Sequence, residues 1–239
     1  LVATLVAEGV LDSELGLKQY LKNTLFPGKY AFQLPVVNQP VFRKESFNIL
    51  DFGAKAGGIA LNTTAINRAI DTCSQHGGGV VIIPPGLWLT GPVRLQSHVN
   101  LHLAKGALLQ FTTDLDQYPL LRTNWEGVEA IRNQSPLYGV DLEDIAITGE
   151  GIIDGAGMAW RPLKSSKVTE EEWKKIVASG GVLNETKDTW YPTERALRGS
   201  KATRPGVVAE GYDEAKALEI KEFLRPNMLS LVRCKRILI

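Results

Sequence analysis

Short apolar segments, separated by glycine, asparagine, serine or aspartate, follow one another from Pro85 to Asp154. Each is three to five residues long, and most alternate apolar with polar residues or form short apolar runs, as β-strands do. No helix of ordinary length fits between them. Strands this short must pair laterally into a sandwich, a barrel or a solenoid. This pattern restricts the fold more than any other feature of the chain.

Internal similarity favours the solenoid. The strings HVNL (98–101), DIAI (144–147) and RILI (236–239) correspond to one another. Val99 and Ile145 are 46 positions apart, and Ile145 and Ile237 are 92 apart, which is twice 46. Fixed spacing of a strand unit is typical of solenoids. The spacing predicts coils of about 23 residues, with three short strands in each coil.

A helix precedes the first apolar strand. Asn62 or Thr63 can cap its start, apolar residues share one face, and Gly77 to Gly79 end it. The end of a solenoid exposes an apolar layer and unpaired backbone groups, which an amphipathic helix can cover. We therefore expect a cap helix; the alternative is one helix of an α/β unit.

The remaining segments suggest how the chain is organised. Residues 12–26 have helical periodicity, so residues 1–46 are expected to be an N-terminal helix and linker. Residues 47–239 are expected to begin a β-helix domain, with a helical insertion at about 156–226. Within that insertion, Thr169 and Glu172 form a capping-box pattern, and residues 212–224 also suggest a helix. The predicted fold class is thus all-β: a right-handed parallel β-helix (solenoid) with an N-terminal cap helix and a helical insertion.

Composition limits the classes of partner. With 27 basic and 26 acidic residues, the net charge is +1, which argues against a dedicated nucleic-acid binder. The chain has no run of 18 apolar residues, so we expect no membrane span. Its two cysteines form neither a disulfide framework nor a metal-ligand pattern. We expect no metal and no cofactor.

Three strings carry a resemblance to a known family: FNILDFGAKAGG (47–58), GGGVVIIPPGLWLTGPVRLQSHVNLHLAKGALL (77–109) and DIAITGEGIIDGAG (144–157). In this order they resemble the start of glycoside hydrolase family 28, the polygalacturonases or pectin hydrolases. TNWEGVEA (123–130) and FLRPNMLSLVRCKRILI (223–239) look most like the bacterial exo-acting branch. The resemblance implies a right-handed parallel β-helix that hydrolyses α-1,4 bonds of galacturonan with inversion.

The resemblance also implies an Asn-Thr-Asp triplet, an Asp-Asp pair, a Gly-His-Gly and an Arg-Ile-Lys. The chain contains no Asp-Asp pair, and Asn62-Thr63-Thr64 lacks the acid. Gln75-His76-Gly77 and Arg236-Ile237-Leu238 do not match either. We therefore assign no catalytic residue and expect the chain to be an N-terminal portion of such an enzyme.

Other carboxylates are expected to have structural roles. Asp154 belongs to an Asp-Gly turn pattern after a strand. Glu143 and Asp144 are neighbours in a turn and are expected to be solvated. General acid–base catalysis requires two carboxyl groups that face one cavity, which adjacent turn residues seldom do.

Four residues are candidates for substrate binding: Arg122, Trp125, Glu126 and Arg225. The first three are expected in a loop between repeats. Aromatic faces stack on sugars, and an arginine can hold a uronate carboxylate with two hydrogen bonds. Trp190 and Tyr191 could wall a further subsite. The expected partner is an acidic plant polysaccharide or oligosaccharide, and the expected location is secreted or periplasmic. No oligomeric state is predicted.

Two other functions stay open. The missing acids favour a non-catalytic β-helix protein that binds carbohydrate or has a structural role. A polysaccharide lyase on the same scaffold would use Ca²⁺ held between acidic clusters, and the scattered acids of this chain give it little support.

Overall fold

The computed structural model describes residues 38–239. The helix expected at residues 12–26, and most of the linker after it, lie outside the described residues. The described part forms one compact unit, Gln39–Ile239. Most of its strands are only two to five residues long, in agreement with the sequence pattern.

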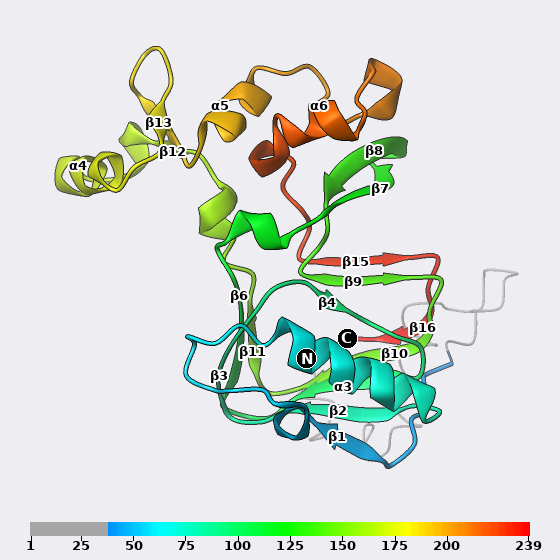
Figure 1. Cartoon of the computed structure of the whole chain (residues 1–239). Helices are drawn as coiled ribbons and strands as arrows, with labels where there is room; N and C mark the ends of the chain where they lie inside the picture. Colours follow the sequence, from blue (N-terminus) through cyan, green and yellow to red (C-terminus); the bar gives the residue numbers. More distant parts are fainter. Residues whose placement is uncertain (1–37) are drawn as a thin grey trace, which may run out of the picture. The chain divides into compact units, whose positions relative to one another are not determined.

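The chain winds through three parallel sheets in repeated coils (Figure 1). Each complete coil contributes one strand to each sheet. The first coil contains β2 (Gly79–Ile83), β3 (Gly86–Thr90) and β4 (Val93–Arg94); the second contains β5 (Val99–Leu103), β6 (Ala107–Phe111) and β9 (Leu137–Val140); the third contains β10 (Glu143–Gly149), β11 (Ile152–Asp154) and β15 (Leu229–Val232). The strand β16 (Lys235–Leu238) begins a fourth coil, and β1 (Ser46–Asn48) pairs with β2 at the opposite end. Parallel crossovers are right-handed, and the fold is a right-handed parallel β-helix.

The strand register corrects the predicted coil length. Gly79 pairs with Val99, so the coil between them has 99 − 79 = 20 residues. Asn100 pairs directly with Ala146, and Ile145 pairs directly with Ile237. The spacings of 46 and 92 residues are therefore single coils enlarged by insertions, and not two and four coils. The predicted periodicity was wrong because the lengths of the two enlarged coils, 46 and 92 residues, happen to be multiples of one number.

Alternate side chains of the coils point inward. In β2, β5 and β6, every second residue is buried, as expected for strands with one face toward a core. The core is formed by apolar side chains stacked from coil to coil: Val81, Ile83, Trp88, Val93, Val99, Leu101, Leu103, Leu109, Phe111, Leu137 and Ile145. This core stacks the coils and fixes where each insertion leaves the solenoid.

The cap helix α3 (Thr63–Gln75) covers the first coil (Figure 1). Ile66, Ala69, Ile70 and Cys73 are fully buried on its inner face, which confirms the predicted periodicity. Burial raises the pKa of Cys73 to about 11, so this thiol stays neutral. Asn62 precedes the helix but its side chain does not cap it. Its amide instead donates to the carbonyls of Lys55, Ala60 and Leu89, which ties the cap to β3.

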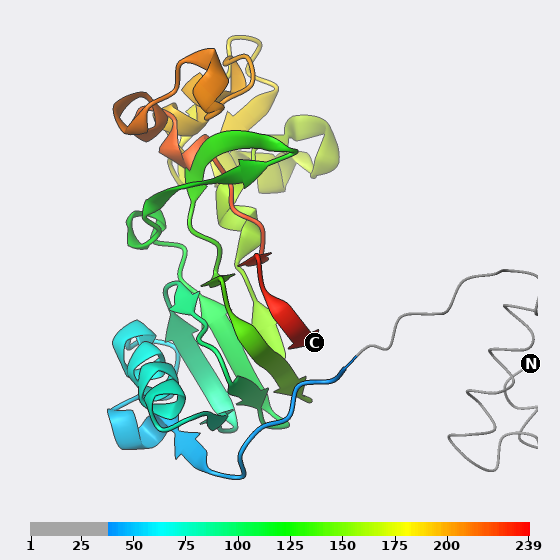
Figure 2. The same ribbon diagram turned by 90° about the vertical axis from the view of Figure 1, so that its right-hand side faces the viewer.

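Two insertions leave the stack on the same side (Figures 1 and 2). The second coil extends between β6 and β9 into an antiparallel hairpin of β7 (Leu120–Trp125) and β8 (Val128–Asn133), where the sequence indicated only a loop. The third coil extends between β11 and β15. Its elements are η3 (Gly157–Trp160), β12 (Leu163–Lys164), η4 (Ser165–Lys167), α4 (Glu170–Ala178), β13 (Val182–Leu183), β14 (Thr189–Tyr191), α5 (Glu194–Ser200), η5 (Val208–Glu210), α6 (Glu214–Leu218) and η6 (Lys221–Phe223).

The helices of the long insertion agree only partly with prediction. The capping box of Thr169 and Glu172 is present at the start of α4. The single helix expected at residues 212–224 is instead α6 followed by the short η6. Ile220 leaves the helical region between them, with φ −128°. Ala217, Ile220 and Leu224 pack with Ile131 of the hairpin, so tertiary packing outweighs local helix propensity here.

Charged side chains hold the third and fourth coils together. The carboxylate of Asp144 accepts two hydrogen bonds from Arg236, and Glu143 accepts a third at 2.9 Å. Arg233 pairs in the same way with Asp141. These bonds lower the pKa of Asp144 and Asp141 below their ordinary values. Glu143 and Asp144 thus begin strand β10 and are held by Arg236, so the solvated turn expected from the sequence is wrong.

Candidate functional site

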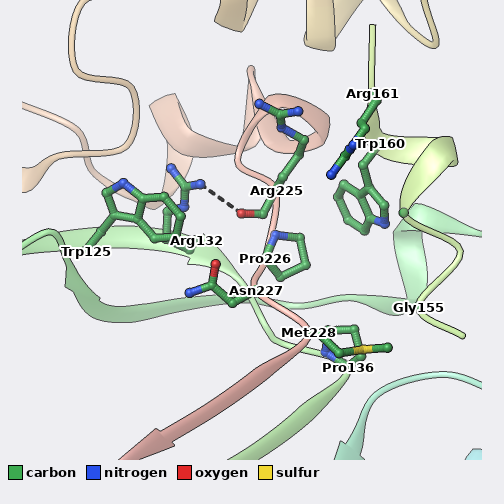
Figure 3. A pocket seen from close by; sticks show the side chains of 11 residues that line it. Trp125, Arg132, Pro136, Gly155, Trp160, Arg161, Arg225, Pro226, Asn227 and Met228 are labelled. Atoms are coloured by element: carbon green, nitrogen blue, oxygen red, sulfur yellow. Dashed lines mark hydrogen bonds between the residues drawn. The ribbon is translucent and has the colours of Figure 1, made fainter. Parts of the chain in front are cut away.

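A hollow of about 520 Å³ lies between the two insertions and the coils from which they leave (Figure 3). This volume falls in the range of ligand sites. We call it the arginine–tryptophan hollow. Its lining residues come from the hairpin, from the end of β11 and η3, and from the segment that leads into β15: Trp125, Arg132, Pro136, Gly155, Gly157, Trp160, Arg161, Arg225, Pro226, Asn227 and Met228.

Arg132 is the most unusual residue of the hollow. It is only 9% exposed, and its guanidinium carbon lies 3.8 Å from the centre of the Trp125 ring. Its Nη2 donates to the carbonyl of Arg225 at 2.8 Å, whereas Nε is buried without a partner. Burial, and then the nearby charge of Arg225, lower the pKa of Arg132 to about 10, while Glu126 opposes the shift. The guanidinium is therefore still charged at neutral pH.

Trp160 forms a rigid wall on the other side of the hollow. It is 5% exposed, and its ring meets that of Tyr118 edge to face at 5.1 Å. The Tyr118 hydroxyl donates to the carbonyl of Thr112 at 2.9 Å. Burial, and then the charge of Asp114, raise the pKa of Tyr118, so it remains a neutral donor. Trp160 therefore forms a fixed wall of the hollow and leaves only a small part of its ring open to a ligand.

The charge of the hollow is positive. Arg132, Arg161 and Arg225 line it, and no aspartate or glutamate does. Within residues 38–239, none of these three arginines takes part in a salt bridge. A buried cation without a counter-charge is costly, and a bound anion would relieve that cost. The hollow therefore suits an anionic ligand that also has a face for aromatic stacking.

Two of the four predicted binding residues line this hollow, and two do not. Trp125 lines it from the hairpin, and Arg225 lines it from the segment before β15. Arg122 lies on the other face of the hairpin, because side chains alternate along β7, and it pairs with the exposed Glu129 at 2.9 Å. Glu126 is exposed at the hairpin tip, with φ +51°. Its charge raises the pKa of Arg132, but its side chain does not line the hollow. Substrate binding by these residues stays a prediction.

Among the charged and aromatic lining residues, the sequence analysis missed three: Arg132, Trp160 and Arg161. A signal for Arg132 was present, since it is an arginine inside the strand pattern VEAIRN. Its cross-strand partner Leu121 lies on the same face of β7 as Trp125. That signal could be used only once the hairpin was recognised. Trp160 and Arg161 follow the Asp-Gly turn, where no periodicity indicates the direction of a side chain.

The remaining candidates lie elsewhere. Trp190 lines a separate hollow of about 480 Å³, together with Asp114, Asp116 and Glu222. That hollow is acidic, so it is a poor match for an acidic sugar. His98 lies 3.3 Å from Asp144, whose carboxylate is already held by Arg236. Asp154 accepts a hydrogen bond from the amide of Ala156, as expected for a turn residue.

Comparison with known proteins agrees with the fold. No protein-family model matches the chain. It is 35% identical over 127 residues to a probable polygalacturonase of Vitis vinifera; the aligned region covers 49% of this chain and 26% of that protein. It is 30% identical over 171 residues to an exo-poly-α-D-galacturonosidase of Dickeya chrysanthemi; the aligned region covers 68% of this chain and 25% of that protein.

A solved structure shares the architecture. The exopolygalacturonase from Thermotoga maritima matches with a TM-score of 0.56 and 29% identity, over 84% of this chain and 41% of that one. The chain is a relative of the family 28 polygalacturonases. This agrees with the resemblance found in the sequence motifs. The chain spans about a quarter of the length of the curated relatives that it matches.

Proposed function

We propose that this chain belongs to a pectin-degrading glycoside hydrolase that acts on galacturonan by inverting hydrolysis, and that its residues bind the substrate and do not cut it. The observation that carries the proposal is the buried, unpaired Arg132 stacked on Trp125 in a hollow with two further arginines. A uronate combines a carboxylate with a sugar face. Arginine recognises the carboxylate with paired hydrogen bonds, and tryptophan packs on the sugar face.

The absence of acids from the hollow restricts its chemistry. Inverting hydrolysis requires one carboxylic acid to protonate the leaving oxygen and one carboxylate to activate water. None of the lining residues carries a carboxyl group. We therefore assign binding to this chain and leave bond cleavage to groups outside its 239 residues.

Since the polymer is extracellular, we further propose a secreted or periplasmic location. None of the described helices is long and apolar enough to cross a membrane.

Titration calorimetry with digalacturonate tests this proposal. The fully methyl-esterified dimer is the matched control, because it keeps the sugar faces but lacks the charges. We expect saturable binding of the acid form that weakens as salt rises, and little binding of the ester. Equal binding of both forms would contradict the proposal that the arginines bind the carboxylates of the ligand.

A reducing-sugar assay on polygalacturonate, run on the same preparation, separates binding from cleavage. We expect no release of galacturonate. Release would mean that this chain contains its own catalytic acids. Absence of binding in calorimetry would instead favour the alternative of a structural β-helix protein.

A further inference from the structure

The edge of β8 that faces away from β7 joins the two insertions. One edge of β8 pairs with β7. At the other edge, the amide of Ile131 donates to the carbonyl of Gly206 at 2.8 Å, and Ala130 forms an antiparallel bridge with Val207. Further along, the amide of Asn133 donates to the carbonyl of Leu224 at 3.3 Å. Two separate pieces of the long insertion therefore bind one strand of the hairpin.

Asn133 adds a side-chain connection to this seam. It is 3% exposed, and its Nδ2 donates to the carbonyl of Lys221 at 2.7 Å and to that of Leu224 at 2.9 Å. Both carbonyls belong to the turn that ends at Arg225. The amide oxygen Oδ1 is buried without a partner. An unsatisfied acceptor carries a desolvation cost, so the favourable contribution of this side chain comes from its two donated bonds.

Asn133 and Arg132 bind the same turn from opposite faces of β8. Arg132 faces the arginine–tryptophan hollow and donates to the carbonyl of Arg225. Asn133 faces the apolar seam formed by Ile131, Ala217, Ile220 and Leu224. The turn at 221–225 therefore cannot shift without breaking the bonds of both residues.

We infer that Asn133 is a positioning residue: it fastens the turn at 221–225 to the hairpin and thereby fixes Arg225 beside Arg132 in the hollow. This inference rests on the proposed function, since it concerns the shape of the same binding site. Asn133 does not touch the ligand. It acts through the backbone that carries Arg225.

The close approach of backbones at the seam supports a fixed arrangement. Gly206 has φ +78°, and a Cβ atom there would lie 2.6 Å from the carbonyl oxygen of Ile131. Within the long insertion itself, a Cβ atom at Gly199 would lie 2.3 Å from the Cβ of Phe223, so α5 packs tightly against the turn at 221–225. A side chain at Gly206 would push the insertion away from the hairpin. The seam therefore depends on contact at main-chain distance, which the amide of Asn133 completes.

The test compares Asn133→Ala with Asn62→Ala. Asn62 is a matched control, because it is also 3% exposed and its Nδ2 also donates to backbone carbonyls, but at the cap helix. Both variants should lose thermal stability. Only Asn133→Ala should bind digalacturonate about tenfold more weakly, and only it should exchange the amide hydrogens of residues 221–226 faster.

A disulfide rescue separates positioning from any other effect of Asn133. Ala130→Cys with Val207→Cys places two cysteines across an antiparallel bridge, where backbone spacing suits a disulfide. In the Asn133→Ala background, the oxidised form should regain affinity, and reduction should remove it again. The crosslink also keeps the seam closed should Asn133→Ala alone fail to fold.

The possible results are distinct. Unchanged affinity of Asn133→Ala, with wild-type protein that binds, overturns the inference and leaves the proposed function intact. Failure of the oxidised crosslink to restore affinity also overturns it. If wild-type protein does not bind digalacturonate, the proposed function fails. The fastening role of Asn133 is tested independently of binding: unchanged amide exchange at residues 221–226 in Asn133→Ala would overturn it.

Discussion

Arg132 is a buried cation whose stabilising partners are a carbonyl and an aromatic face. Cation–π contact with Trp125 and one hydrogen bond to Arg225 compensate part of its desolvation, and Nε remains unsatisfied. Such an arrangement is understandable in a binding site, where a ligand completes the set of partners. It would be a poor choice for a residue that only fills space.

Replacing Arg132 by leucine should separate binding from stability. We expect Arg132→Leu to weaken digalacturonate binding by roughly 1.5–3 kcal/mol, the usual loss for a hydrogen bond to a charged group. Thermal stability should be kept or raised, because the buried charge is gone. Calorimetry and thermal melting measure the two effects.

Arg122→Leu is the control for this prediction. Arg122 lies on the same hairpin, but on its opposite face, and it pairs with Glu129 at the surface. Its replacement should leave both affinity and stability nearly unchanged, because exposed ion pairs contribute little. Equal loss of affinity in the two variants would mean that the ligand does not enter the arginine–tryptophan hollow.

At the scale of elements, stacking of the coils depends on close backbone approach at a few positions. Gly149 ends β10 and pairs with Leu103 of β5. It has φ +103°, and a Cβ atom there would lie 1.9 Å from the carbonyl oxygen of Leu103. Gly53 has a similar φ of +90°, but nothing lies within 4 Å of its missing Cβ. Comparing substitutions at the two glycines therefore distinguishes the cost of a left-handed backbone from the cost of a steric clash with the neighbouring coil.

Alanine at these two positions should have different costs. Gly53→Ala should lose about 1 kcal/mol of unfolding free energy, from the left-handed backbone alone. Gly149→Ala should lose about 3 kcal/mol or more, because the second and third coils must also move apart. Chemical denaturation measures both, and similar losses in the two variants would refute the role of contact between these coils.

The elements differed in how well the sequence predicted them. The cap helix and the short strands were predictable, because burial imposes a period on their apolar residues. The hairpin was not, since Leu120–Trp125 and Val128–Asn133 include polar residues on both faces. Missing the hairpin hid Arg132 and left Arg122 and Trp125 looking like neighbours in one loop, although they face opposite sides.

At the scale of the whole molecule, a regular solenoid supports a site that it does not itself contain. The coils bring Gly155, Pro136 and Met228 to one place, and the two insertions add the arginines and tryptophans above them (Figure 3). Residues far apart in the chain, such as Trp125 and Arg225, therefore meet only because two successive coils open at neighbouring positions. Spacing along the sequence could not predict this meeting, because it depends on the lengths and packing of both insertions.

The central claim is that the arginine–tryptophan hollow holds the carboxylate of a galacturonate. A crystal structure of the chain with digalacturonate tests it most directly. We predict a carboxylate within hydrogen-bond distance of the Arg132 or Arg225 guanidinium, and a sugar face packed on Trp125 or Trp160. A dimer bound at another surface, with this hollow empty, would contradict the account.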